Sequence, residues 1–238
     1  MTHPTEFAPG LIVQGIDAPL NLADYRLIAF DMDSTLINIE CVDEIADAAG
    51  RKAEVAAITE AAMQGVITDY KESLRQRVAL LKGVPMSHLE QVYTQRLRFN
   101  PGAQQLVAAA KACGLATLLV SGGFTFFSNR VRAGLGIDFS RSNQLEVRNG
   151  VLTGRMLDQT WGDICDGAEK RRMLLEVCAK LNISPREAIA VGDGANDLPM
   201  MNEAGLSVAF HAKPKVREQA LVQVNEGGLA RVLELFSG

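Results

Sequence analysis

Residues 26–36, RLIAFDMDSTL, decide the fold. After the arginine, the first half of this stretch is apolar at every position, which is typical of a parallel strand buried on both faces. Its second half, DMDST, is rich in polar groups. Two later stretches repeat the change from an apolar run to a polar cluster: LATLLVSGG at 115–123 and AIAVGDG at 188–194. The three stretches therefore predict strands of one sheet.

Helical patterns separate these strands, and further strands follow them. Helices are expected at about 100–114, 124–135, 168–181, 197–204, 215–220 and 228–236, and strands at 206–209 and 221–224. The first of these helices would have Asn100 as its N-cap and Pro101 in its first turn. The dipeptide Asn149-Gly150 predicts a hairpin. Alternating strands and helices predict an α/β protein, with a parallel sheet covered by helices on both faces.

The segment after the first strand differs, because its pattern is helical throughout. Glycines and prolines divide it into four short helices, which predict a small bundle. We therefore expect a helical insertion at 39–99 within a core made of residues 25–38 and 100–238. Residues 1–24 show no sustained period and predict a loose N-terminal arm, with one short strand at Leu11–Val13.

Composition narrows the classes of function. The 238 residues carry a formal net charge of −4, which argues against sequence-independent binding to nucleic acid or to an anionic membrane. Apolar runs are too short to span a bilayer, and the first residues lack the pattern of a signal peptide. The four cysteines form no CxxC pair. We therefore expect a cytoplasmic protein, and its oligomeric state stays open.

The carboxyl ends of parallel strands meet at one edge of a sheet, and ligands bind beyond that edge. There we expect Asp31, Asp33, Asp193 and Asp197 to lie together. Two unit charges 4 Å apart repel by roughly 4 kcal/mol at an effective dielectric constant of 20, so such a cluster needs a cation. Because the ligands are all oxygen atoms, Mg²⁺ is the cation that they favour.

The same edge carries donors for a phosphate group. Ser121 supplies a hydroxyl, Gly122 and Gly123 supply backbone N–H groups, and a lysine would add positive charge. A carboxylate can attack phosphorus and form an aspartyl phosphate. Asp31 is the better nucleophile because it closes the strand, and Asp33 suits a general acid because the negative cluster raises its pKa. The sequence thus predicts a magnesium-assisted phosphate site.

The motifs FDMDSTL, LVSGGF and VGDGANDLPM resemble those of the haloacid dehalogenase-like hydrolases. The similarity is closer to the members that hydrolyse phosphoserine, since DMDSTLINIE, ECVDEIADAAG, ESLRQRVALLKG, VSGGFTFF and AVGDGANDLPMM occur in the same order with similar spacings. This resemblance covers Leu27 to the C-terminus. It implies a Rossmann-like core with a four-helix-bundle cap inserted after the first strand. It also implies Mg²⁺ as cofactor and conversion of L-phosphoserine to L-serine and phosphate, the last step of serine biosynthesis.

The resemblance implies roles for particular residues. Asp31 matches the nucleophile and Asp33 the acid/base. Asp31, the backbone carbonyl of Asp33, and Asp193 match the Mg²⁺ ligands. The remaining matches are Ser121, Gly122 and Lys170 for the phosphate, Asn196 for substrate orientation, Asp197 for support of the metal or the lysine, Glu40 for the substrate ammonium, and Arg77 for its carboxylate.

Helical spacing adds independent support for Arg77. This residue falls on one apolar stripe with Tyr70 and Leu81, where a charge needs a partner. Arg75 lies on another side of the same helix and is expected to be a solvated surface residue. Without the resemblance, Glu40 fits an exposed carboxylate at a helix start equally well, and Arg77 could form an internal salt bridge.

Other interpretations stay open beside this one. Each motif alone is common in ordinary turns, and only their conjunction after three apolar strands favours a function. Phosphothreonine offers the same charged groups as phosphoserine, and one methyl group discriminates by only ~10–200-fold. A phosphoacceptor signalling domain would be shorter and would have no use for an inserted cap. A scaffold without activity is disfavoured because Asp31, Asp33, Lys170 and Asp193 are all present.

Overall fold

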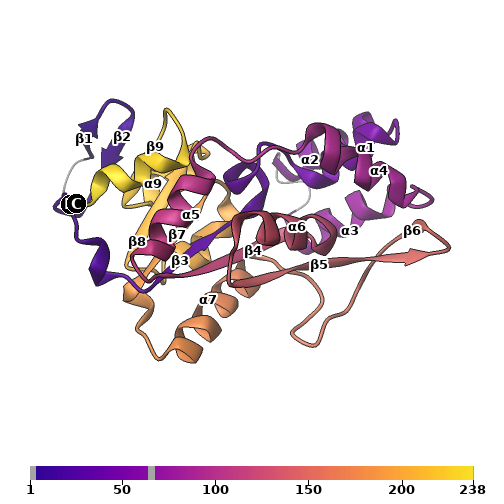
Figure 1. The fold of residues 1–238 in the computed structure, drawn as a ribbon. Helices are drawn as coiled ribbons and strands as arrows, with labels where there is room; N and C mark the ends of the chain where they lie inside the picture. Colours follow the sequence, from indigo (N-terminus) through magenta and orange to yellow (C-terminus); the bar gives the residue numbers. More distant parts are fainter. Residues whose placement is uncertain (1–3, 64–67, 238) are drawn as a thin grey trace.

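The computed structural model describes residues 4–63 and 68–237 (Figure 1). Parts of the expected arm, insertion and core, at 1–3, 64–67 and 238, lie outside the described residues. Within the described residues, nine strands form one sheet in the order β1-β2-β9-β8-β7-β3-β4-β5-β6. The strands are β1 (Thr5–Ala8), β2 (Leu11–Val13), β3 (Leu27–Phe30), β4 (Ala116–Phe124), β5 (Phe139–Arg148), β6 (Val151–Leu157), β7 (Ala188–Gly192), β8 (Leu206–Phe210) and β9 (Val222–Val224).

The central strands are mostly apolar, and the polar residues within them, such as Thr117 and Ser207, are buried. All four residues of β3 are buried, and β3 pairs in parallel with β4 on one side and with β7 on the other. The β7–β8 and β8–β9 pairs are parallel too. At the far edge, β5 and β6 form the antiparallel hairpin around Asn149-Gly150. The three strands predicted from apolar runs are therefore neighbours, and the α/β fold class is confirmed.

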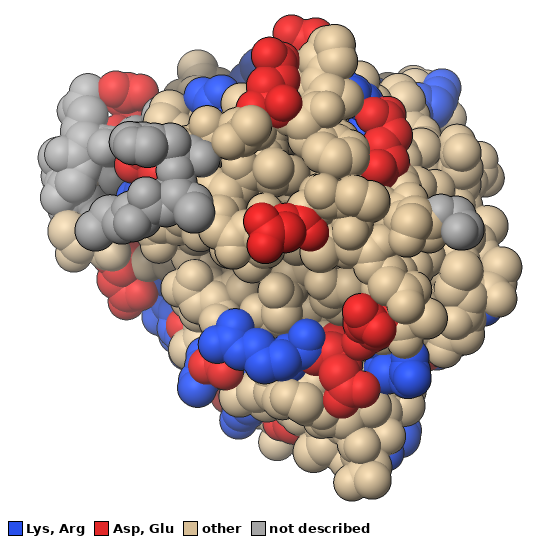
Figure 2. Space-filling model, turned by 90° about the vertical axis from the view of Figure 1, so that its left-hand side faces the viewer, with Lys and Arg blue, Asp and Glu red and all other residues tan. Residues whose placement is uncertain are grey.

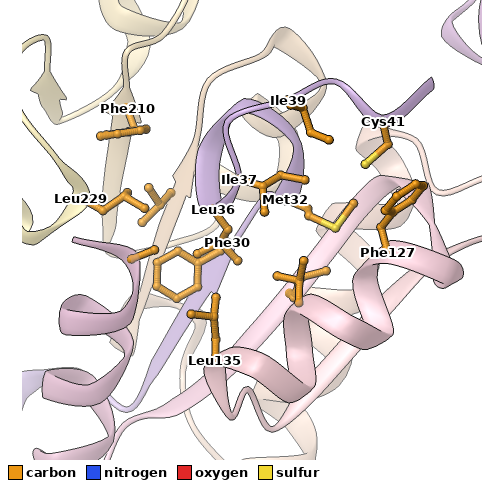
Figure 3. Packing of buried hydrophobic residues seen from close by; sticks show 14 of the residues in the cluster. Phe30, Met32, Leu36, Ile37, Ile39, Cys41, Phe127, Leu135, Phe210 and Leu229 are labelled. Atoms are coloured by element: carbon orange, nitrogen blue, oxygen red, sulfur yellow. The ribbon is translucent and has the colours of Figure 1, made fainter. Parts of the chain in front are cut away.

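Helices cover both faces of this sheet. Ile28 and Phe30 of β3 face a core shared with α5 (Ala103–Ala112), α6 (Thr125–Leu135) and the 3₁₀ helix η6 (Leu229–Leu235). Figure 3 shows Phe30 and Leu135 in this core. Leu27 and Ala29 face the opposite core, which is shared with α7 (Gly167–Leu181), α8 (Leu198–Met201) and α9 (Pro214–Gln219). The alternation of side chains along β3 thus builds two hydrophobic layers.

Between β3 and β4 the chain forms a group of helices beyond one end of the sheet (Figure 1). They are α1 (Cys41–Ala48), α2 (Lys52–Met63), α3 (Tyr70–Ala79) and α4 (Met86–Gln91), and a π-helical segment at Val92–Arg96 follows α4. We call residues 39–99 the helical insert. The β5–β6 hairpin is bonded to this insert, because Gly83 N–H donates to the Leu152 carbonyl and Leu152 N–H to the Val84 carbonyl, both at 2.8 Å.

Uncharged residues cover most of the face shown in Figure 2, and acidic and basic side chains are scattered over it. In the described part of the chain, no helix has the length and apolar character that crossing a membrane requires.

The short strand expected at Leu11–Val13 is confirmed as β2. The expectation of a loose arm around it is wrong for residues 5–13, which belong to the sheet. There β1 and β2 form a hairpin, and β2 pairs in an antiparallel manner with β9. Leu11 and Val13 are buried in the core beneath. The sequence pattern could not show the hairpin or its pairing with β9, because the segment is too short for a period and the partner strand lies at the other end of the chain.

The prediction that Asn100 caps a helix is also wrong. Helix α5 begins at Ala103, and its N-cap is Gly102 in the left-handed region with φ 81°. The Asn100 side-chain amide instead donates to the carbonyls of Thr35, at 2.8 Å, and Ile37, at 3.1 Å. Next to it, Ile37 and Phe99 form an antiparallel bridge. Asn100 therefore ties together the two chain segments that connect the core to the helical insert.

We expect Asn100→Ala to lower the free energy of unfolding by about 1–3 kcal/mol, because two carbonyls lose their donor. Urea denaturation followed by circular dichroism measures this. Gln104→Ala, an exposed position at the start of α5, serves as the control and should change stability by less than ~0.5 kcal/mol. Equal stability of the two variants would contradict the role given to Asn100.

Candidate active site

The ends of three neighbouring strands place the polar clusters beside one another. Asp31 follows β3, Ser121 lies near the end of β4, and Asp193 follows β7. The N–H of Asp31 donates to the carbonyl of Val191 at 3.0 Å, which fixes the first cluster against the third. The structure thus brings together residues that are widely separated in the sequence.

These clusters line a cavity of about 540 Å³ between the sheet edge and the helical insert. Of the residues singled out from the sequence, those on its wall are Asp31, Asp33, Glu40, Tyr70, Arg77, Ser121, Gly122, Gly123, Asp193 and Asn196. Lys170 and Asp197 are fully buried. Lys170 contacts both Asp31 and Asp197, which places these two buried residues directly behind the wall.

Lys170 joins two of the carboxylates. Its Nζ atom lies 2.6 Å from Oδ1 of Asp31 and 2.6 Å from Oδ1 of Asp197. Burial by itself would lower the pKa of Lys170, but Asp197 and Asp31 outweigh it and raise that pKa. The other oxygen of Asp197 accepts from the N–H groups of Asp193, at 3.1 Å, and Gly194, at 3.0 Å. Asp197 therefore anchors both the lysine and the loop after β7.

Three carboxylates at the end of the sheet form a cluster suited to a hard cation. Oxygen atoms of Asp31, Asp193 and Asp197 lie within 4.8 Å of one another. Burial raises the pKa of Asp31 well above its usual range, and the charge of Asp197 raises it further. The same two causes raise the pKa of Asp193 to about 7. Both oxygens of Asp197 are engaged, one by Lys170 and one by the loop after β7, whereas Lys170 occupies only one oxygen of Asp31. Asp31 and Asp193 are therefore the carboxylates that best fit a divalent cation.

The loop after β3 carries Asp33 and Glu40 into the cavity. Ser34 takes a positive φ of 57°, which turns the chain sharply after Asp33. The Asp33 carboxylate accepts from the backbone N–H and the thiol of Cys41, both at 3.1 Å, and Glu40 accepts from the Ser34 hydroxyl at 2.6 Å. Burial, and then the charge of Glu40, raise the pKa of Asp33 to about 7. A carboxyl group with this pKa can both donate and accept a proton near neutral pH.

The glycines after Ser121 allow close approach to the cavity. A Cβ atom at Gly122 would lie 2.0 Å from the Tyr70 hydroxyl, and one at Gly123 would lie 3.3 Å from Oδ2 of Asp33. The Gly123 N–H was expected to face a phosphate, but it donates to the Ser121 hydroxyl at 2.8 Å. That leaves the Ser121 side chain and the Gly122 N–H as the donors for an anion.

The two arginines of α3 have different surroundings. Arg77 is half-buried on the cavity wall, and its Nε donates to the Ser73 carbonyl at 3.4 Å. Arg75 is exposed, as expected, but it is not merely solvated. Its guanidinium lies 2.6 Å from Asp163, which Lys71 also contacts at 2.7 Å. The helical insert is therefore joined to the core by a small group of ion pairs outside the cavity.

Sequence reasoning missed several residues in and around the site. Lys213 lines the cavity, and the rule that ligands bind beyond strand ends could have found it, because it follows β8. The Asn143 amide donates to the Gly122 carbonyl at 2.7 Å and accepts from the Cys165 N–H at 2.8 Å, which fixes the Gly122 peptide. Cys41 reaches Asp33 through the turn at Ser34, and no sequence signal announces that contact.

The chain is similar in sequence to known proteins. A family model described as haloacid dehalogenase-like hydrolase matches residues 28–202. The phosphoserine phosphatase of Albidiferax ferrireducens is 73% identical over 234 residues, which cover 98% of this chain and 99% of that protein. The phosphoserine phosphatase of Polaromonas sp. is 72% identical over 233 residues, with the same coverage of 98% and 99%.

Solved structures show the same likeness. The phospho-aspartyl intermediate analogue of a phosphoserine phosphatase superposes with a TM-score of 0.82 at 37% identity, covering 90% of this chain and 99% of that one. A substrate-bound phosphoserine phosphatase superposes with a TM-score of 0.80 at 36% identity, again covering 90% and 99%. From its sequence and its fold, this chain belongs to the haloacid dehalogenase-like hydrolase family.

Proposed function

We propose that the protein hydrolyses L-phosphoserine to L-serine and phosphate through an aspartyl phosphate on Asp31, with Mg²⁺ as cofactor, as the last step of serine biosynthesis. The observation that carries this proposal is a single cavity lined by two chemically different sets of side chains. Asp31 and Ser121 suit a phosphate, and Glu40 and Arg77 line the same cavity with groups suited to an ammonium and a carboxylate. The names of the two relatives above 70% identity support the same substrate.

At the phosphate end, Ser121, Gly122 and Lys170 supply donors and positive charge. A carboxylate oxygen of Asp31 forms a bond to phosphorus while the bond from phosphorus to the serine oxygen breaks. The Nζ atom of Lys170, 2.6 Å from Asp31, holds this carboxylate in place. Mg²⁺, held by Asp31, Asp193 and the backbone carbonyl of Asp33, would supply positive charge that stabilises the transferring phosphoryl group.

Asp33 handles the protons in both halves of the reaction. With a pKa of about 7, it is partly protonated at neutral pH and gives its proton to the departing serine oxygen. It then takes a proton from the water that attacks phosphorus, and the bond between phosphorus and Asp31 breaks. The products are free phosphate and the original Asp31 carboxylate, so the cycle is closed.

At the amino-acid end, the helical insert would act as a cap over the substrate. Glu40 would meet the substrate ammonium and Arg77 its carboxylate, while Asn196 would help to orient the substrate. We place the hinges at 37–40 and 98–102. These segments run side by side where the chain enters and leaves the insert, since Asn38 N–H donates to the Arg98 carbonyl at 3.1 Å. Closure would exclude water from the phosphorylated intermediate.

Phosphate release from a panel of phosphorylated metabolites tests this function. Phosphoserine should have the highest kcat/KM, ahead of phosphothreonine, phosphoethanolamine and phosphoglycolate. A preference for an ester that lacks either the ammonium or the carboxylate would contradict the substrate assignment. The panel also separates phosphoserine from phosphothreonine, whose extra methyl group is the only difference between them.

We expect exhaustive chelation to remove most of this activity and added Mg²⁺ to restore it, because the carboxylate cluster repels itself without a cation. Ca²⁺ should bind but restore little turnover, since its larger and looser coordination shell positions the attacking oxygen poorly. Phosphate release in metal-free buffer, followed by titration with each ion, measures both effects. Full activity after chelation would be incompatible with the proposed metal site.

A further inference from the structure

Asp43 is a carboxylate in the cavity that none of the steps above uses. It lies in the first turn of α1 and lines the cavity together with Glu40 and Arg77. Its Oδ1 atom is buried and, among the described residues, has no hydrogen-bond partner. Burial raises the pKa of Asp43, and the nearby charge of Arg77 is the strongest influence that opposes this rise. Buried carboxylate oxygens without a partner are costly and rare, so this one calls for a partner.

Arg77 faces the same cavity with unused donors. Its hydrogen bond to the Ser73 carbonyl, at 3.4 Å, uses only Nε and stays within α3. Among the described residues, neither Arg77 nor Asp43 takes part in an ion pair. A guanidinium carries five N–H donors in a planar fork, so it can contact one carboxylate with one edge and a second carboxylate with another.

We propose that Asp43 is a positioning residue for Arg77. When the substrate carboxylate binds, Arg77 bridges it to Asp43, and Asp43 holds the guanidinium in the orientation that a two-point contact requires. The same bridge gives the orphaned Oδ1 of Asp43 its partner. Asp43 does not touch the substrate and acts only through Arg77. This inference rests on the proposed function, in which Arg77 binds the substrate carboxylate.

The geometry favours this role over a direct contact with the substrate ammonium. Glu40 precedes α1 and already bonds the Ser34 hydroxyl, so it lies at the loop that carries Asp33. Asp43 lies about one turn further along α1. Of the neighbouring charges, that of Arg77 has the largest effect on the pKa of Asp43. A substrate whose phosphate is at Asp31 would therefore reach Glu40 with its ammonium, while Asp43 supports the arginine.

Steady-state kinetics of Asp43→Asn on three substrates test the proposal. For phosphoserine and phosphoglycolate, which carry a carboxylate, KM should rise by about tenfold with little change in kcat. For phosphoethanolamine, which carries an ammonium but no carboxylate, both constants should stay near those of the unmodified protein. Turnover of phosphoethanolamine also reports that the variant is folded.

The controls give the outcomes that would overturn the proposal. Glu44→Gln removes the neighbouring negative charge on α1, which pairs with Arg96 outside the cavity. This variant should have unchanged kcat and KM for all three substrates. In an Arg77→Ala background, Asp43→Asn should cause no further loss on phosphoserine. The proposal would be overturned if KM for phosphoserine did not change, or if kcat/KM fell equally for all three substrates. It would also be overturned if kcat/KM fell for phosphoethanolamine alone, or if the losses of the two substitutions added in the double variant.

The same data separate this inference from the proposed function. If the unmodified protein fails to prefer phosphoserine over phosphoethanolamine, the proposed substrate is wrong and the inference falls with it. If that preference is present and Asp43→Asn leaves it intact, only the role of Asp43 is wrong.

Discussion

Asp31→Asn should abolish phosphate release from phosphoserine, with a loss of at least roughly 10⁴-fold in kcat, because a carboxamide cannot attack phosphorus as a carboxylate does. The fold should persist. The asparagine oxygen can still accept a hydrogen bond from Lys170, and the second partner of Lys170, Asp197 at 2.6 Å, is untouched. Thermal unfolding followed by circular dichroism checks that the variant remains folded.

A trapping experiment identifies the attacking residue directly. Labelled phosphoserine is mixed with the protein, the reaction is quenched in acid, and the labelled peptide is located by mass spectrometry. Label should be found on the peptide that contains Asp31, and none should be found with Asp31→Asn. Covalent label on any other residue, Asp33 included, would show that Asp31 is not the nucleophile.

The sheet could be predicted from the sequence because its centre is determined locally. In β3, β7 and β8 every residue is buried, and largely apolar runs of this kind arise where a strand is covered on both faces. The strand ends then converge for geometric reasons, since parallel neighbours in register finish at one edge. For that reason Asp31, Ser121 and Asp193 could be placed together before their distances were known.

What the sequence could not reveal depends on partners that lie far along the chain. The β1–β2 hairpin pairs with the free edge of β9, and the sequence of residues 5–13 does not indicate that this edge is there. Asn100 looks like a helix cap, but the carbonyls of Thr35 and Ile37 compete successfully for its amide. Arg75 carries the pattern of a solvated residue, although Asp163 lies 2.6 Å away in the folded chain. Side-chain pairing of this kind leaves no periodic signal.

Arg77→Ala should lower kcat/KM for phosphoserine by on the order of 10²–10³, because losing one partner of a buried charged contact typically costs several kcal/mol. A small aryl phosphate without ammonium or carboxylate should be hydrolysed at nearly the usual rate. Its phosphate would still meet Ser121 and Lys170, which the substitution leaves in place. Arg77→Lys should restore little, since lysine cannot form the two parallel hydrogen bonds of a guanidinium with a carboxylate.

Arg75→Ala is the matched control, two residues away on the same helix. Its ion pair with Asp163 is largely exposed, and Asp163 keeps its contact with Lys71 at 2.7 Å. Exposed pairs contribute roughly 0–1 kcal/mol, so α3 should keep its position and both substrates should react nearly as before. If Arg75→Ala and Arg77→Ala behave alike, or if Arg77→Ala slows both substrates equally, then Arg77 supports the helical insert and does not bind the substrate carboxylate. A selective loss on phosphoserine would tie the substrate preference to one guanidinium on the cavity wall.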